Sequence, residues 1–339
     1  MCFLIMEAKY YSKKGNGIRC NLCPHSCSIQ DGRFGICKAR QNQGGVLNAL
    51  GYGVISSSGL DPMEKKPLYH FHPGSRIFSI GSYGCNLHCD FCQNFEISQS
   101  FPVSMPPLRS YQPSEVVEKA RVLPENIGIA YTYNEPTISF EFMLETARLA
   151  KSKGLLNVAV SNGYINPAPL RELLEVLDAF NIDLKSFSDD FYCSQTGGRL
   201  KPVLKTLVTI RELGKHLEIA FLVIPGLNDS LAETKAMVSW IASNLGSNTV
   251  LHINRYYPAY KLKIPPTPEE RLVELYEIAR EKLAYVYLGN LHGNEVGCNT
   301  ICPSCSSTVI RRNGYHTVIS ALTREGRCSS CGYGPIVVM

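Results

Sequence analysis

Three cysteines in one short run are the residues best suited to chemistry in this chain. Cys85, Cys89 and Cys92 form a C-x3-C-x2-C pattern within Gly-Cys-Asn-Leu-His-Cys-Asp-Phe-Cys-Gln-Asn. A cubane iron–sulfur cluster usually takes four cysteine ligands, so three cysteines leave one iron open to a small molecule. The alternative is a closed zinc site with His88 or a distant residue as fourth ligand. The run as a whole favours the cluster.

This spacing resembles the signature of the radical S-adenosylmethionine (SAM) enzymes. In those enzymes the open iron chelates the amino and carboxylate groups of the methionine part of SAM. An electron from the cluster then cleaves the sulfonium and releases a 5′-deoxyadenosyl radical. The resemblance therefore implies a four-iron four-sulfur (4Fe-4S) cluster on Cys85, Cys89 and Cys92 and SAM as cosubstrate.

Polar residues follow the next expected strand, in Thr-Tyr-Asn-Glu-Pro. Asn134 and Glu135 offer oxygen acceptors for the ammonium of bound methionine. Radical SAM enzymes use a Gly-Gly-Glu segment for this purpose, from which Tyr-Asn-Glu departs. The alternative is a carboxylate placed at a helix N-terminus by the helix dipole. We expect the pair to contact SAM.

The two following strands also end in polar residues. Asn162 precedes a glycine and suits a hydrogen bond to a ribose hydroxyl, although an ordinary Asn-Gly turn has the same sequence. Asp183 and Lys185 alternate onto one face of a strand end, where a buried charge needs a partner. In glycyl-radical activating enzymes a similar Asp-x-Lys lies beside the SAM carboxylate. A plain buried ion pair is the alternative.

Two further cysteine groups flank this region. The pairs Cys-Pro-Ser-Cys and Cys-Ser-Ser-Cys indicate a structural zinc ribbon, with rubredoxin-like iron as the alternative; they comprise Cys302, Cys305, Cys328 and Cys331. An N-terminal group could hold zinc or a second iron–sulfur cluster; it comprises Cys20, Cys23, Cys27 and Cys37. We expect a second, N-terminal metal centre of unknown identity.

Two less specific segments have weaker functional interpretations. Lys65 and Lys66 could close over the site or belong to a solvated linker. A late strand end could line the substrate end of the site, although a strand histidine is more often a satisfied core residue; its polar residues are His252, Arg255, Tyr256 and Tyr257.

Alternating strands and helices must position these residues. Short β-branched runs predict strands at 77–80, 127–131, 157–160, 181–184, 217–224, 250–254 and 285–288. Helical periods predict helices at 137–153, 167–177, 229–245 and 267–282, the second capped by Asn166 and the last opening with a capping box at Thr267. Repeated strand–helix–strand units indicate an α/β fold with parallel strands, a full or partial (β/α) barrel, and a doubly wound sheet is the rival. Functional residues gather at the C-terminal ends of barrel strands.

Size and composition set the remaining limits. The 339 residues, 45% hydrophobic and 19% charged, suit a folded protein of three parts: an N-terminal cysteine-rich module and linker at 1–75, a barrel at 76–295, and a zinc-ribbon-like module at 296–339. A net charge of +5 without basic blocks gives no indication of nucleic-acid binding. Residues 1–6 are too short an apolar run for a secretory signal, and no run reaches membrane-spanning length. With 14 cysteines in metal-like clusters, we expect a cytoplasmic protein.

Longer motifs resemble one family across nearly the whole chain. They include Cys-Asn-Leu-Cys-Pro-His, Asp-Pro-Met-Glu-Lys-Lys-Pro-Leu-Tyr-His-Phe, the cysteine run, Tyr-Thr-Tyr-Asn-Glu-Pro and the last Cys-Pro-x-Cys. The chain resembles the AmmeMemoRadiSam-system radical SAM proteins, relatives of pyruvate formate-lyase activating enzymes. The resemblance implies an oxygen-sensitive enzyme that takes electrons from a low-potential donor such as flavodoxin or ferredoxin. A protein substrate, a small metabolite, or a non-catalytic electron-carrying role remain the three alternatives.

Overall fold

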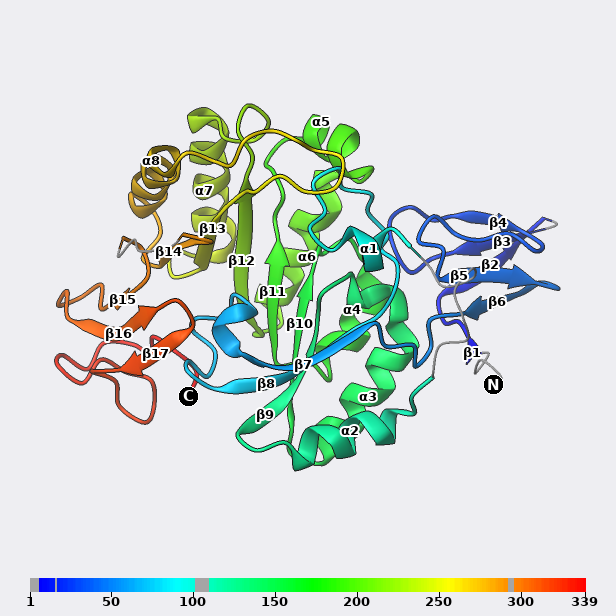
Figure 1. Cartoon of the computed structure of the whole chain (residues 1–339), viewed down its shortest axis with the longest axis horizontal. Coiled ribbons are helices and arrows are strands. Elements are labelled where there is room, and N and C mark those ends of the chain that lie inside the picture. Colours follow the sequence, from blue (N-terminus) through cyan, green and yellow to red (C-terminus); the bar gives the residue numbers. More distant parts are fainter. Residues whose placement is uncertain (1–5, 16, 101–109, 292–295) are drawn as a thin grey trace.

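The computed structural model describes residues 6–15, 17–100, 110–291 and 296–339 (Figure 1). Residues 1–5 of the apolar N-terminal run lie outside this part of the chain. No helix within it is both long and apolar enough to cross a bilayer. Figure 1 shows an N-terminal module and a C-terminal module at opposite ends of a central sheet.

The central sheet has eight strands in the order β14-β13-β12-β11-β10-β9-β8-β7. Seven of them run parallel in chain order, and β7 pairs antiparallel with β8 at one edge. The two edge strands do not pair within the described residues, so the sheet is a partial barrel. Its strands are β7 (Ser57–Pro62), β8 (Arg76–Gly81), β9 (Asn126–Tyr131), β10 (Leu156–Ser161), β11 (Ala179–Asp183), β12 (His216–Val223), β13 (Val250–Arg255) and β14 (Val286–Gly289).

Helices connect successive parallel strands and cover the sheet (Figure 1). Strands such as β10 and β11 are almost continuously buried, as expected where helices cover a parallel sheet. The helices are α1 (Phe95–Ser98), α2 (Pro113–Val122), α3 (Phe140–Ser152), α4 (Pro167–Leu174), α5 (Asp189–Phe191), α6 (Leu200–Glu212), α7 (Leu231–Leu245) and α8 (Glu269–Arg280).

The N-terminal module consists of two small antiparallel sheets. A buried ion pair fastens it to α3: the guanidinium of Arg40 donates to both carboxylate oxygens of Glu141 at 3.0 and 2.8 Å. Both side chains are at most 3% exposed. The strands are β1 (Met6–Glu7), β2 (Tyr11–Lys14), β3 (Gly17–Cys20), β4 (Ser28–Gln30), β5 (Arg40–Gln43) and β6 (Val46–Ala49).

The C-terminal module is a three-stranded antiparallel sheet that packs on the barrel. Its strands are β15 (Thr300–Ile301), β16 (Thr308–Asn313) and β17 (His316–Ile319). The buried ring of His70 joins the two parts, with Nδ1 2.7 Å from the carbonyl of Ile336 and Nε2 2.6 Å from the hydroxyl of Tyr287. Burial lowers the pKa of His70 to about 3, so the ring is neutral at physiological pH.

The α/β fold with a partial barrel is confirmed, and each predicted strand is present to within two residues at either end. The capping box at Thr267 is wrong, because its hydroxyl accepts from the backbone N–H of Tyr256 and donates to the carbonyl of Val223. Asn166 does precede α4, but its side chain bonds to the N-terminal module rather than to the helix. The boundaries at residues 75 and 295 stay predictions, and β7 joins the barrel sheet from within the first 75 residues.

Candidate active site

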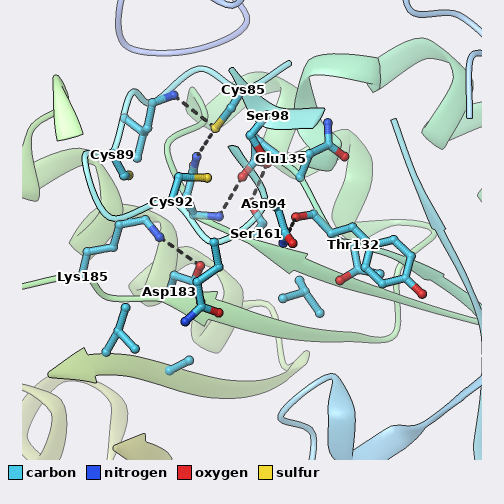
Figure 2. A pocket seen from close by; sticks show the side chains of 18 of the residues that line it. Cys85, Cys89, Cys92, Asn94, Ser98, Thr132, Glu135, Ser161, Asp183 and Lys185 are labelled. Carbon is cyan, nitrogen blue, oxygen red and sulfur yellow. Dashed lines mark hydrogen bonds and ion pairs between the residues drawn. The ribbon is translucent and has the colours of Figure 1, made fainter. Parts of the chain in front are cut away.

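A cavity of about 420 Å³ opens at the C-terminal ends of the parallel strands (Figure 2). The cysteine loop follows β8 and forms one wall. The residues after β9, β10 and β11 form the others, as the barrel rule predicts. The structure thus brings together all eight residues predicted for the cluster and SAM, namely Cys85, Cys89, Cys92, Asn134, Glu135, Asn162, Asp183 and Lys185.

The cysteine thiols are largely enclosed by protein. Burial raises the pKa of Cys85 well above its usual range, and the Glu135 carboxylate adds to this rise. Burial also raises the pKa of Cys89 to about 12, although Lys185 opposes the shift. Both thiols are therefore protonated at neutral pH until a metal displaces the proton, which couples thiolate formation to metal binding.

The sulfurs of this loop are less compactly arranged than those of a closed zinc site. Zinc–sulfur bonds of about 2.3 Å in a tetrahedron place the sulfurs ~3.8 Å apart. Among the described residues, no three ligand atoms of the loop, His88 included, lie within 4.8 Å of one another. The His88 ring instead lies with Nδ1 2.8 Å from Oε1 of Gln99. The geometry favours a larger centre with a ligand position facing the cavity.

Tyr133 and Asn134 fix the start of the cysteine loop. Tyr133 has a φ of +70°, a region that favours glycine, which explains why the family's Gly-Gly-Glu segment has glycine there. Its hydroxyl donates to Asp61 Oδ2 at 2.6 Å, which helps to hold this conformation. The Asn134 amide accepts from the backbone N–H of Ser82 at 2.9 Å and donates to the carbonyl of Gly84 at 2.8 Å.

Glu135 is a buried carboxylate at the junction of β9 and β10. Its Oε1 accepts from the backbone N–H and hydroxyl of Thr137 and from the hydroxyl of Ser161. Within the described residues, its Oε2 accepts only from the backbone N–H of Asn162, at 2.8 Å. Burial raises the pKa of Glu135, and these hydrogen bonds oppose the rise. Oε2 therefore has acceptor capacity left for a ligand.

Asn162 bridges the β10 end and the cysteine loop. Its amide donates to Asn86 Oδ1 at 2.8 Å and to Cys85 Sγ at 3.6 Å, and its Oδ1 accepts from the backbone N–H of Tyr164. The predicted Asn-Gly turn is also present, because Gly163 has a φ of +69°. Sequence reasoning missed Asn86, whose side chain anchors the loop to Tyr164 and Asn162.

Asp183 and Lys185 line the cavity and form an ion pair with each other, with Nζ 3.0 Å from Oδ2 (Figure 2); the role of Lys185 toward SAM stays a prediction. Burial disfavours the Lys185 ammonium, but the Asp183 carboxylate outweighs burial and holds the pKa of Lys185 above the usual value. The Lys185 ammonium also lies 5.9 Å from the ring centroid of Phe91. The cavity thus contains a permanent positive charge beside the cysteine loop.

A second charged group lies at the edge of the cavity. Lys65 and Lys66 both line it, and both donate to Asp61, at 2.8 and 2.6 Å. Lys66 is buried and its ammonium lies 4.7 Å from the Tyr133 ring centroid. Lys66 is thus part of the site wall and not of a solvated linker. Sequence reasoning missed Asp61, which lies between the two lysines and Tyr133.

The predicted substrate end on β13 is wrong for His252. This buried ring bonds to Glu218 on β12, which also accepts from the backbone N–H groups of Tyr69 and His70, away from the cavity. Arg255 bonds to Glu269 and Thr267, and neither Tyr256 nor Tyr257 lines the cavity. The cavity residue of β13 is Asn254, which the sequence reasoning missed.

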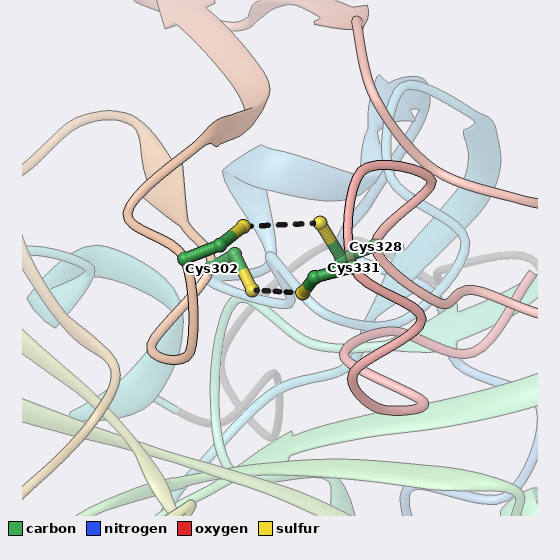
Figure 3. A group of neighbouring side chains, drawn as sticks. Cys302, Cys328 and Cys331 are labelled. Atoms are coloured by element: carbon green, nitrogen blue, oxygen red, sulfur yellow. Dashed lines mark hydrogen bonds between the residues drawn. The ribbon is translucent and has the colours of Figure 1, made fainter.

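The C-terminal cysteines form a compact metal-binding group (Figure 3). Cys302 Sγ lies 3.6 Å from Cys331 Sγ, and Cys305 Sγ lies 3.7 Å from Cys328 Sγ. All four sulfurs lie within 4.8 Å of one another. These spacings match four thiolates around one tetrahedral ion.

Whether the implied iron–sulfur cluster and SAM fit this cavity depends on the metal-binding and charged side chains that line it. Three cysteine thiols, those of Cys85, Cys89 and Cys92, line one cavity. The same cavity contains a cation, Lys185, and a buried carboxylate, Glu135, which match the carboxylate and ammonium of an amino acid. The residues present therefore fit an open cluster and SAM.

Comparison with known proteins identifies the family. Residues 79–238 match the model of the radical SAM superfamily. An uncharacterised protein of Methanocaldococcus jannaschii is 42% identical over 330 residues, 96% of this chain and 97% of that protein. The pyruvate formate-lyase-activating enzyme of Clostridium pasteurianum is 24% identical over 227 residues, 62% of this chain and 92% of that enzyme. A radical SAM methyltransferase of Sphaerobacter thermophilus shares the fold, with a TM-score of 0.50 and 17% identity over 64% of this chain and 67% of that one. The chain belongs to the radical SAM superfamily.

Proposed function

We propose that this enzyme cleaves SAM reductively at a 4Fe-4S cluster held by Cys85, Cys89 and Cys92 and abstracts a hydrogen atom from a protein substrate. The observation that carries the proposal is one cavity lined by three cysteine thiols, the Lys185 ammonium and the Glu135 carboxylate. A bound cluster and SAM would supply the chemistry, namely one-electron reductive cleavage of the sulfonium and radical abstraction of hydrogen from the substrate.

The chain's own residues bind and orient SAM. Lys185 pairs with the methionine carboxylate, and Asp183 keeps the lysine charged and oriented. Glu135 accepts from the methionine ammonium through Oε2, and Asn134 fixes the loop beside it. Asn162 donates to a ribose hydroxyl or orients Cys85 for the cluster.

A protein substrate is supported by the relative from Clostridium pasteurianum, whose name describes activation of another enzyme. A small metabolite is the alternative. A low-potential donor such as flavodoxin or ferredoxin would supply the electron. The narrower assignment to the AmmeMemoRadiSam system also stays a prediction. The described cysteines form no disulfide, in keeping with the cytoplasmic location that we propose.

A structural zinc ion in the C-terminal module completes the proposal. A closed four-thiolate site adds folding free energy to a small domain that has little core of its own. Only nine buried residues make up the cluster that joins this module to the barrel, several of them from the barrel itself. Rubredoxin-like iron would fit the same sulfurs and is the alternative.

The test is the release of 5′-deoxyadenosine from SAM. The anaerobically reconstituted and reduced full chain should release it, and Cys89→Ala should not. Cys193→Ala is the matched control, because Cys193 is exposed and lies outside the three cysteine groups. No release from a protein with a complete, reduced cluster would contradict the proposed reaction and favour the electron-carrier alternative.

A further inference from the structure

The N-terminal cysteines converge on one place in the N-terminal module. Cys20 ends β3 and its backbone N–H donates to the carbonyl of Cys27 at 2.9 Å. Cys23 lies on the loop between them and interacts electrostatically with Cys20, Cys27 and Cys37. Cys37, from the turn before β5, interacts with Cys20 and Cys27 as well. The four cysteines, from two loops, therefore lie near one another in the N-terminal module.

The spacing of these thiols differs from that of the C-terminal group. Among the described residues, only the C-terminal sulfurs form a group within 4.8 Å, the spacing of a single tetrahedral ion. No three of the N-terminal sulfurs approach one another so closely, and the same holds for Cys85, Cys89 and Cys92. In a cluster each thiolate binds a different iron, so the sulfurs must stand farther apart. Neither the N-terminal group nor the radical SAM loop therefore has the compact spacing of the C-terminal group.

A buried, unpartnered donor faces this group. Arg40 is 1% exposed, and its Nε has no hydrogen-bond partner in the described residues. Its other nitrogens bond to Glu141 and to the carbonyl of Ile138. The guanidinium interacts electrostatically with Cys20 and Cys37. An anionic, sulfur-rich centre would supply the acceptor that Arg40 Nε lacks.

The N-terminal group also lies next to the radical SAM loop. His25, two residues after Cys23, has Nε2 2.7 Å from the carbonyl of Asn86, the neighbour of Cys85. Asn166 at the start of α4 donates to the carbonyls of Asn21 and Cys23. Cys23 and Cys85 are therefore connected by a short path, which runs along the chain from Cys23 to His25, across the hydrogen bond to Asn86, and on to Cys85.

We propose that Cys20, Cys23, Cys27 and Cys37 bind a second iron–sulfur cluster, beside the one on the radical SAM loop. Four cysteines would ligate all four irons of this cluster and leave no iron open, so it would not bind SAM. Its short connection to Cys85 places two paramagnetic centres side by side when both are reduced. The site goes beyond the proposed SAM reaction, because its existence does not depend on that reaction.

The first test counts metals in the wild-type chain after anaerobic reconstitution. Two four-iron clusters predict about eight iron and eight sulfide atoms per chain, whereas one cluster predicts about four of each. The reduced protein should also show magnetic interaction between two centres in its electron paramagnetic resonance spectrum. About four iron with two zinc ions per chain would overturn the proposal.

The second test uses Cys85→Ala/Cys89→Ala/Cys92→Ala, which lacks the SAM reaction and so separates the two proposals. This variant should keep about four iron and a reduced-cluster signal that SAM does not change. Adding Cys23→Ala and Cys37→Ala should remove that iron, while adding Cys193→Ala, the matched control, should not. A triple variant with native circular dichroism and no iron would overturn the proposal. If a variant does not fold, the wild-type count decides.

Discussion

Replacing Lys185 by methionine removes the positive charge beside the cysteine loop while keeping most of the length of the side chain. Lys185 lies 3.0 Å from Asp183 and its side chain is 15% exposed, whereas that of Asp183 is 40% exposed. Asp183 can therefore be hydrated after the substitution, and the fold should survive. None of the three cluster ligands is touched, so the iron content should stay that of the wild type.

The expected loss is in SAM affinity. A hydrogen bond to a charged group contributes ~1.5–3 kcal/mol, and each 1.4 kcal/mol corresponds to about tenfold in the dissociation constant. Lys185→Met should therefore weaken SAM binding by roughly tenfold to a hundredfold. Equilibrium dialysis of labelled SAM against the cluster-loaded variant measures this directly.

Lys261→Met is the matched control. Lys261 also pairs with an aspartate at 3.0 Å, Asp90 on the cysteine loop, but its side chain is 58% exposed and does not line the cavity. Its loss should leave SAM affinity within about twofold, because exposed ion pairs contribute little. Unchanged affinity in Lys185→Met with full iron content would refute the role given to Lys185.

Three further predictions concern stability and metal content. Arg40→Met leaves the buried Glu141 carboxylate without its ion-pair partner and should lower the free energy of unfolding by ~3–5 kcal/mol, measured by chemical denaturation. The double variant Arg40→Met/Glu141→Leu should recover part of this loss. A double variant that loses the sum of the two single losses would contradict the ion-pair account. Because burial lowers the pKa of His70 to about 3, the unfolded chain binds more protons below pH 6.5, and stability should fall as pH drops from 6.5 toward 3. Between pH 6.5 and 4.5 the free energy of unfolding of His70→Gln should fall by ~2–3 kcal/mol less than that of the wild type. Identical pH profiles of the two proteins would refute this. Cys328→Ser should release one zinc ion and lower the melting temperature without lowering iron content, and a loss of one iron instead would contradict the zinc assignment and favour rubredoxin-like iron.

The cysteine loop and the parallel strands were predictable because their signals are local. Cysteine spacing, β-branched runs and strand alternation need only neighbouring residues, and alternation correctly placed Asp183 and Lys185 together in the cavity. The same rule misplaced His252. His252 lies on the same face of β13 as Asn254, but two residues farther from the C-terminal end of the strand. Its ring bonds to Glu218 instead of facing the cavity.

Contacts between distant segments were not predictable. Arg40 and Glu141 are separated by 101 residues, and nothing in either neighbourhood indicates that they meet. Asn86 lies among cluster ligands and bonds to Asn162, a partner that only the folded barrel supplies. Helix α6 was missed as well, because Pro202 in its first turn obscured the helical period.

The central claim is an iron site that no protein side chain fills. Electron–nuclear double resonance of the reduced enzyme, with SAM labelled at the methionine amino nitrogen and carboxylate oxygen, tests this claim most directly. Hyperfine coupling of both labels to one iron of the cluster is the predicted result. A cluster whose fourth iron couples to a protein ligand, or a zinc ion bound to Cys85, Cys89 and Cys92, would contradict it.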